Sequence, residues 1–411
     1  MPKKGGVSDK RQSEKTNVMD RRAVLIRLSA IAAGAVTGWP KITPAKDEGE
    51  TDARSQKRDK MRMIATEEAF VIPEIAEALR ELVKRGGTNL DLKLLSTIYD
   101  PPPLAKEQPQ PAATNRDAFA RLLLPKLLDL DKGRLAEMDA SGVDMHLLSL
   151  SMPGVQMFEK DKAIAFARLS NDRLKETIDR YPKRFAGLAA FAPQDPKAAA
   201  KEMERAINTL KLNGFLVNSH TLNRYLDEPE FYPILEAAEA LDAPLYIHPR
   251  APSDGMAAPF GDYRIEGAIW GYGAETGVHA LRLMMSGVLD RFPRLKIVLG
   301  HMGEALPFWM WRLDFMGAPG GRAGRFNKLK PSEYFRRNFA ITTSGVEDPL
   351  ALRFCIDKLG VESVMWAIDY PFQPTAPAVA FLETAQLSEQ ERNLVAHGNA
   401  ERIFKIPSKS Q

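Results

Sequence analysis

The chain has 411 residues, of which 44% are hydrophobic and 27% charged, and it carries a formal net charge of +4. This globular composition excludes a disordered or collagenous chain, and the single cysteine, Cys355, excludes a fold held by internal disulfides. Residues 1–60 hold 14 Lys and Arg against 8 Asp and Glu, whereas the rest holds 43 against 45, so the body lacks the basic bias expected of a nucleic-acid-binding protein.

The first 60 residues indicate a leader followed by a linker. A basic start reaches the pair Arg21-Arg22, and a weakly apolar stretch over 23–39 follows, interrupted by Arg27. Paired arginines before such a stretch resemble a twin-arginine export signal. We therefore expect the twin-arginine export machinery as a partner and a periplasmic location. The alternative is a disordered basic tail on a cytoplasmic protein.

From Arg62 onward, short apolar runs alternate with longer amphipathic segments. Strands are predicted over 62–66, 145–151, 185–191, 214–219, 244–248, 296–300, 339–343 and 364–368. Helical periodicity lies between them, for example over 165–180, 196–210, 275–291 and 348–359. This alternation predicts an α/β fold, a single (β/α)8 TIM-type barrel over 61–411.

Two features leave alternatives open within this prediction. A doubly wound sheet would show the same alternation, but no glycine-rich phosphate loop follows any of the predicted strands. The proline-rich run over 101–111 breaks the first long connection between strands. It predicts an extended excursion over the barrel mouth or a plain surface loop.

Residues that can bind a metal or carry a proton follow four of the predicted strands. Glu67 follows the first strand, and His248 ends the fifth. His301 follows the sixth strand, with Glu304 three residues later, and Asp369 follows the eighth. Because barrel enzymes place their chemistry at the carboxyl ends of the strands, these groups predict one site. Carboxylates and imidazoles without a thiolate suit one divalent ion, Zn²⁺, Mn²⁺ or Mg²⁺.

The remaining histidines and the cysteine are predicted to have other roles. His146 lies within a strand and is expected to be buried and hydrogen-bonded. His279 and His397 are expected to be structural, and Cys355 to pack in the core. His220 follows the fourth strand, where either a structural role or a place at the rim of the site is open.

Several contiguous motifs then carry a family resemblance that spans 62–405. They are IATEEAF, LYIHPR, HALRLMMSG, LGHMGEALPFWMWRLDFM, ITTSG and AIDYPF. The chain resembles the amidohydrolase-2 branch of the metal-dependent amidohydrolases, and within it the non-oxidative aromatic-acid decarboxylases. NSHTLNRYLDE and GAIWGYGAETGVHALRL extend the likeness toward 5-carboxyvanillate decarboxylases, with 2,3-dihydroxybenzoate and γ-resorcylate decarboxylases also similar. The resemblance implies the same barrel and homodimers or homotetramers with neighbouring subunits at the pocket rim.

The resemblance also implies roles for the residues at the strand ends. The metal ligands of the family fall on Glu67, His248 and Asp369. His301 falls beside the metal, as a further ligand or as an acid/base group with Glu304 as its partner. Many amidohydrolases have a histidine where this chain has Ala69. Losing that imidazole favours a single metal with positions open for substrate.

The implied reaction is loss of CO2 from a hydroxylated aromatic acid. A metal that holds the phenolate and one carboxylate oxygen pushes electron density into the ring, and an acid then protonates the ring carbon that bears the carboxylate. The resemblance assigns that proton to Asp369, with His301 and Glu304 supplying or relaying it. A hydrolase of a lactone, ester or amide is the alternative, because the ligand set permits both reactions.

Three further residues are candidates for contact with the substrate. Arg312 matches a substrate-contacting arginine of the carboxyvanillate enzymes, and a helix-surface salt bridge is its alternative. Phe372 is expected to pack against the substrate ring or in the core. The carboxyvanillate-type enzymes that this chain resembles have tyrosine at the position of Phe372. Arg250 follows His248 closely and is a second candidate clamp for a carboxylate, or else lies in a solvated loop.

Overall fold

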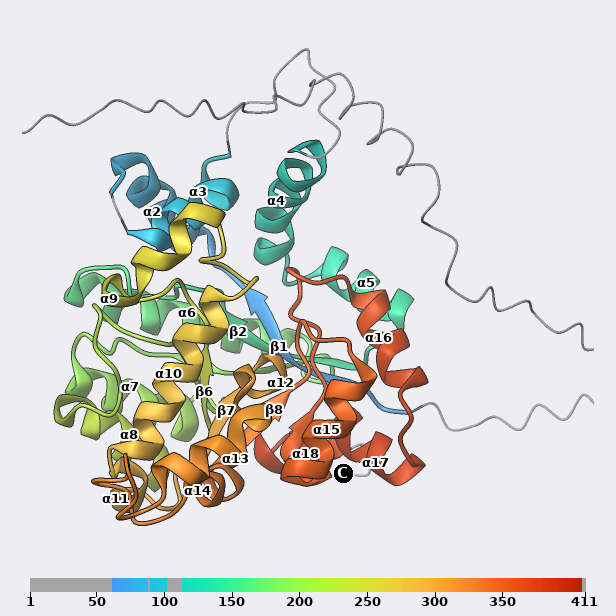
Figure 1. Ribbon diagram of the computed structural model, residues 1–411. Coiled ribbons are helices and arrows are strands. Elements are labelled where there is room, and N and C mark those ends of the chain that lie inside the picture. The colour runs from blue at the N-terminus through green and yellow to red at the C-terminus, as the bar shows by residue number, and fades with distance from the viewer. Residues whose placement is uncertain (1–60, 88, 102–112, 409–411) are drawn as a thin grey trace, which may run out of the picture. The chain divides into compact units, whose positions relative to one another are not determined.

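A computed structural model describes residues 61–87, 89–101 and 113–408 of the chain (Figure 1). The predicted leader over 1–60 and nearly all of the proline-rich run over 101–111 lie outside the described residues.

Parallel strands follow one another around a barrel in chain order. The strands are β1 (Ile64–Phe70), β2 (Met145–Leu150), β3 (Phe185–Gly187), β4 (Ala189–Ala190), β5 (Phe215–Asn218), β6 (Leu245–His248), β7 (Ile297–Leu299), β8 (Phe339–Thr342) and β9 (Val364–Met365). The Thr66 N–H of β1 donates to the carbonyl of Trp366, the residue directly after β9, at 3.2 Å, and this contact closes the barrel. The predicted (β/α)8 barrel is confirmed.

Helices connect the strands and surround the barrel (Figure 1). They are α2 (Pro73–Arg85), α3 (Leu90–Tyr99), α4 (Ala113–Leu128), α5 (Lys132–Ser141), α6 (Lys160–Arg180), α7 (Pro196–Asn208), α8 (Tyr232–Ala240), α9 (Asp254–Ala257), α10 (Gly271–Met285), α11 (Val288–Arg291), α12 (His301–Glu304), α13 (Leu306–Gly317), α14 (Pro331–Asn338), α15 (Pro349–Leu359), α16 (Thr375–Thr384), α17 (Glu389–Asn393) and α18 (Asn399–Ile403). Short 3-10 turns η1 (Pro229–Phe231), η2 (Ala258–Tyr263) and η3 (Val361–Ser363) and a π-helical turn η4 (Leu394–Gly398) complete the set. None of the helices in the described ranges is both long enough and apolar enough to cross a membrane.

Three predicted elements differ from the structure at their boundaries. The first strand runs on to Phe70, so Glu67 lies inside β1 and not after it. The third predicted strand is interrupted at Leu188, whose N–H still donates to the Leu148 carbonyl at 2.8 Å and so keeps the barrel continuous. The long helix predicted over 275–291 ends at Met285, because Gly287 adopts a left-handed φ of 83° between α10 and α11.

The last predicted strand, over 364–368, is also shorter than expected. After β9 ends at Met365, the Trp366 N–H donates to the Val395 carbonyl of η4 at 2.8 Å. The Ala367 N–H then donates to the Thr343 hydroxyl at 3.1 Å. The backbone that leads to Asp369 is therefore held by a helix and a side chain in place of a strand ladder.

The alternation of side chains along the strands creates two apolar layers. One of them, the outer apolar layer, packs between the strands and the helices. The other, the inner apolar layer, contains one or two inward residues of every strand except β4, with Leu188 between β3 and β4, and is capped by the C-terminal segment. It consists of Ile64, Met145, Leu147, Ala186, Leu188, Leu216, Tyr246, Val298, Ala340, Met365, Ala400, Ile403, Phe404 and Ile406. His248 lies two residues beyond inward Tyr246 on β6, so the period of two turns it toward the barrel axis above this layer.

Candidate metal centre and active site

Three predicted ligands from distant parts of the chain meet above the inner apolar layer. One ligand atom each from Glu67, His248 and Asp369 can be chosen so that all lie within 4.8 Å of one another. His248 Nε2 lies 3.4 Å from Glu67 Oε1. That carboxylate oxygen is buried and accepts no hydrogen bond from the described residues. A buried anionic oxygen without a donor is costly unless a cation binds it, so this cluster fits a divalent metal.

Three hydroxyl groups fix the orientation of the Glu67 carboxylate. Tyr246 and Ser344 donate to Oε2, and Thr342 donates to the same atom at 3.0 Å. This leaves Oε1 turned toward His248. Gly300 makes room for the group, because a Cβ atom there would lie 2.8 Å from Oε2 and 2.9 Å from Oε1. Such partners behind a ligand set its direction and its affinity for the metal.

The tautomer of His248 follows from its neighbours. Nδ1 lies 2.8 Å from the Pro249 carbonyl oxygen and 3.1 Å from Asn218 Oδ1. Because a carbonyl oxygen only accepts, Nδ1 carries the proton and Nε2 presents a lone pair to the centre. Burial lowers the pKa of His248, against the charge of Glu67, so the ring stays neutral as a metal ligand requires.

Asp369, the third member of the cluster, has a strained backbone conformation. Its φ is 74°, in the left-handed region that residues with a side chain seldom adopt. Burial, and then the charge of Glu67, raise the pKa of Asp369 well above its ordinary value. Two adjacent carboxylates, that of Glu67 buried and that of Asp369 half-buried, repel one another until a cation or a proton lies between them. The position therefore suits a group that binds a metal and can carry a proton.

His301 and Glu304 form an acid/base pair beside this cluster. His301 Nδ1 lies 2.9 Å from Glu304 Oε1, and its Nε2 lies 3.8 Å from Glu67 Oε1. Burial alone would lower the pKa of His301, but the charges of Glu304 and Glu67 raise it to about 10. Burial has the opposite effect on a carboxyl group and raises the pKa of Glu304, against the charge of His301. His301 is outside the three-ligand group, and this geometry suits proton transfer more than metal ligation.

A left-handed turn at the end of β7 aims this pair. The φ angles of His301, Met302, Gly303, Glu304 and Ala305 are 50°, 55°, 73°, 53° and 60°. Each left-handed residue with a side chain costs roughly 1–2 kcal/mol, so the surrounding packing must hold the turn. Strain of this kind concentrates at functional sites. Here it folds Glu304 back onto the imidazole of His301.

A second buried carboxylate, Glu68, lies behind the cluster. It accepts hydrogen bonds from the backbone N–H groups of Ile368 and Tyr370, each at 3.0 Å. Burial raises the pKa of Glu68 to about 8, and these backbone donors and the charge of Arg134 oppose that rise.

The three predicted substrate residues lie in different surroundings. Arg250 is buried and forms an ion pair with Asp91, so the solvated loop expected for it is wrong. The guanidinium of Arg250 already donates two hydrogen bonds to the Asp91 carboxylate, which argues against a role for Arg250 in binding a substrate carboxylate. Arg312 lies exposed on α13 and makes no ion pair with the described residues. Phe372 is half-buried and packs against the outer apolar layer, and a role against a substrate ring stays a prediction.

His146 corrects another expectation. It is buried, as expected, but neither ring nitrogen has a hydrogen-bond partner among the described residues. Burial, with the charges of Arg134 and Arg184, lowers its pKa well below the ordinary value, so the ring stays neutral. The ring of Tyr370 lies 5.6 Å away, and the site is an aromatic packing position.

His220 and His279 are buried and belong to hydrogen-bond networks. His220 Nε2 lies 3.2 Å from the Ala251 carbonyl oxygen, and its Nδ1 accepts from the Asn223 N–H. His279 joins α10 to the loop after β5 through Ser219 Oγ at 3.2 Å and the Leu226 N–H at 3.1 Å. Burial lowers their pKa values to about 4 and about 3. Cys355 is a free buried thiol, as expected for a core residue.

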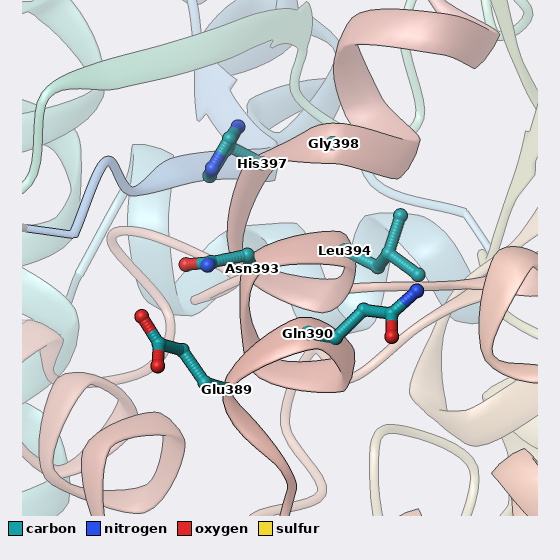
Figure 2. Close-up of a pocket in the computed structure, with 6 residues that line it drawn as sticks. All are labelled: Glu389, Gln390, Asn393, Leu394, His397 and Gly398. Carbon is teal, nitrogen blue, oxygen red and sulfur yellow. The ribbon is translucent and has the colours of Figure 1, made fainter.

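A surface hollow lies at His397 and shares no lining residue with the metal-ligand cluster. It has a volume of about 550 Å³ and is lined by residues of α17 and η4 (Figure 2). His397, one of its lining residues, pairs with Glu401 at 3.0 Å. None of the metal-ligand candidates lines the hollow, so we assign it no chemistry.

Sequence reasoning missed the residues that support the ligands. Tyr246 lies two positions before His248 on one strand, and Thr342 and Ser344 share the ITTSG motif with the same spacing of two. That period places them on the inner face, which is the signal that could have identified them. Asn218 and Glu68 carry no comparable signal, because their partners come from distant segments.

The barrel and the cluster define a metal-dependent (β/α)8 enzyme whose site lies at the carboxyl ends of the strands. The family model described as amidohydrolase matches residues 126–406. The chain belongs to this family.

Relatives of known activity share most of the chain. γ-Resorcylate decarboxylase of Polaromonas sp. is 39% identical over 293 residues, which cover 69% of this chain and 90% of that protein. The structure of 5-carboxyvanillate decarboxylase from Sphingomonas paucimobilis is 52% identical, with a TM-score of 0.77 over 84% of this chain and all of that one. The 5-carboxyvanillate decarboxylase of Novosphingobium aromaticivorans, solved with manganese and 4-hydroxy-3-methoxy-5-nitrobenzoic acid, is 39% identical, with a TM-score of 0.76 over 84% of this chain and 96% of that one.

Proposed function

We propose that this protein is a metal-dependent, non-oxidative decarboxylase of a hydroxylated aromatic acid. The observation that carries the proposal is the pairing of a metal-ligand cluster with an adjacent proton reservoir. Glu67, His248 and Asp369 form the cluster, and His301 with Glu304 forms the reservoir. The activities of the similar decarboxylases support the same reaction class.

The residues divide the reaction between them. Glu67, His248 and Asp369 would hold a divalent metal, which would supply Lewis acidity toward the oxygens of the substrate. Asp369 donates a proton to the ring carbon that bears the carboxylate. The C–C bond then breaks, its electron pair restores the aromatic ring, and CO2 leaves. His301, held by Glu304, returns a proton to Asp369 for the next turnover.

We propose Mn²⁺ as the metal and a substrate with a hydroxyl group ortho to its carboxylate. The manganese in the structure from Novosphingobium aromaticivorans supports the metal, since the ligand set here is carboxylate and imidazole. The substrates named for the similar enzymes, 5-carboxyvanillate and γ-resorcylate, both fit that description. Chelation should abolish activity, and Mn²⁺, Zn²⁺ and Mg²⁺ added separately should rank the metals.

A decarboxylation assay in D2O tests the reaction. The metal-loaded protein is incubated with 5-carboxyvanillate, with γ-resorcylate and with a panel of lactones, while CO2 and acid release are followed. We expect CO2 from at least one aromatic acid and one deuterium at the former carboxylate position. Asp369→Asn should lower the rate by roughly 10²–10⁴-fold.

An exposed aspartate provides the control for Asp369→Asn. Asp357→Asn, the same exchange at an exposed position on α15, should retain the wild-type rate. Acid release from a lactone without CO2 from any aromatic acid would contradict decarboxylation and favour the hydrolase alternative.

We further propose that α13 forms the contact of a homodimer or homotetramer. Phe308, Trp309, Trp311 and Phe315 expose 73%, 52%, 71% and 59% of their surface on this one helix. Exposed aromatic residues grouped in this way are typical of protein interfaces. Such a contact would bring Arg312 of the same helix to the pocket rim of the neighbouring subunit, where it could hold a substrate carboxylate.

Light scattering coupled to size-exclusion chromatography tests this contact. Trp311→Glu should convert the oligomer to monomers and raise KM, because the rim would be incomplete. Trp311→Phe keeps an apolar ring and should keep the oligomer. An unchanged mass for Trp311→Glu would contradict the proposal.

We also propose export to the periplasm by the twin-arginine machinery. The pair Arg21-Arg22 before a weakly apolar stretch supports it. Replacing both arginines with lysine should retain the protein in the cytoplasmic fraction. Equal fractionation of this variant and the wild type would favour a cytoplasmic protein with a basic tail.

A further inference from the structure

The two oxygens of Glu68 hold the backbone on both sides of Asp369. Glu68 Oε1 accepts from the Ile368 N–H and Oε2 accepts from the Tyr370 N–H, each at 3.0 Å. Next to it, the Ala69 N–H donates to the Tyr370 carbonyl at 2.7 Å. Glu68 itself is fully buried. The two residues on either side of Asp369, Ile368 and Tyr370, are therefore bound to two consecutive residues of β1.

The backbone of Asp369 needs such support. Its φ of 74° is unfavourable for a residue with a side chain. Strand β9 has already ended at Met365, so no ladder satisfies the N–H groups of 368 and 370. Without Glu68 both donors would lose their partners in the interior, which the chain avoids by local rearrangement. That rearrangement would move the carboxylate of Asp369.

An irregularity in β1 places two adjacent glutamates for two different tasks. Ala65 pairs with His146 and Glu68 pairs with Leu148, so three steps on β1 oppose two steps on β2. The extra residue is a bulge, which re-aims side chains and is common beside active sites. As a result, Glu67 faces the metal centre while Glu68 reaches the backbone behind Asp369.

We propose that Glu68 is a positioning residue, which sets the affinity of the metal centre by holding Asp369 in its left-handed conformation. Only a carboxylate offers two acceptors and no donor to a pair of N–H groups. The amide of glutamine would turn an N–H₂ group toward one of these donors. This inference rests on the metal centre of the proposed function.

Calorimetric titration of the metal-free protein with Mn²⁺, without any aromatic acid, tests the inference. Glu68→Gln is expected to weaken Mn²⁺ binding by roughly 10–100-fold, the usual effect of losing a partner behind a ligand. Glu68→Asp keeps the carboxylate on a shorter arm and should fall between glutamine and the wild type. The Mn²⁺ electron paramagnetic resonance spectrum should change in the same order, because it reports the geometry of the ligands. Glu77→Gln, an exposed glutamate on α2, is the matched control and should bind as the wild type does.

Each outcome decides the matter. Wild-type affinity in Glu68→Gln, even with a lower melting temperature, would overturn the inference and leave Glu68 a purely structural residue. Should Glu68→Gln fail to fold, wild-type affinity in Glu68→Asp would overturn it in the same way. Mn²⁺ binding by the wild type without CO2 release would contradict the decarboxylase alone, whereas no Mn²⁺ binding would overturn the metal centre and this inference together.

Discussion

At the scale of single residues, the centre depends on groups that never reach the metal position. The carboxylate of Glu67 offers one oxygen to the centre because three hydroxyls hold the other. His248 offers Nε2 because Nδ1 is engaged by Pro249 and Asn218. The ligands were readable as residue types at strand ends, but these hydrogen bonds give them direction.

Removing one of the hydroxyls should loosen the centre without disturbing the barrel. Tyr246→Phe takes away a donor to Glu67 Oε2 and should weaken Mn²⁺ binding by about tenfold. Isothermal titration of the metal-free protein measures this change.

Tyr99→Phe is the matched control for this exchange. The Tyr99 hydroxyl is buried and has no hydrogen-bond partner in the part of the chain that the structure describes. Removing it should leave Mn²⁺ affinity unchanged and the melting temperature equal or slightly higher. Equal losses of affinity in both variants would contradict the assigned role of Tyr246.

At the scale of elements, the site is assembled where regular structure stops. β7 gives way to the left-handed turn of α12, and β9 ends three residues before Ile368. Beside Phe326, α10 likewise ends ahead of a left-handed glycine, Gly287. Each break turns the chain in a direction that a strand or helix cannot take. Sequence periodicity predicted the elements well, but it contains no information on these breaks in backbone geometry.

The break after α10 allows a direct measurement. Gly287 has a φ of 83°, and a Cβ atom there would lie 2.8 Å from the Phe326 carbonyl oxygen. Gly287→Ala should therefore destabilise the protein by about 1–3 kcal/mol in urea unfolding. Gly255→Ala is the control, because a Cβ atom there meets no other atom within 4 Å. A loss below that of Gly255→Ala would show that the turn relaxes without strain.

At the scale of the whole molecule, acid stability depends on histidines that are buried in their neutral form. Burial lowers the pKa of His279 to about 3, far from any role in the metal centre. The unfolded chain binds a proton at this side chain near pH 6.5 and the folded chain does not. The stabilisation that His279 contributes is thus complete above pH 6.5 and is lost as the pH falls toward 3.

A comparison of variants isolates this contribution. His279→Gln should be less stable than the wild type at pH 7, and the difference should shrink by about 1.4 kcal/mol for each pH unit below 6. Urea unfolding of the metal-free proteins between pH 7 and pH 5 measures it. Leu283→Ala, a buried exchange on the same helix that removes no titratable group, serves as the control. A difference that does not depend on pH would contradict a neutral buried His279.

The sequence by itself determined the barrel, because strand and helix periodicity is local and repeats along the chain. It also determined which residue types stand at the strand ends and hence the class of chemistry. The tertiary structure decided how these groups are held. Arg250 pairs with Asp91 across 159 residues, and Glu68 holds a segment 300 residues away. No local pattern records such contacts, because burial and the closure of the barrel bring their partners together.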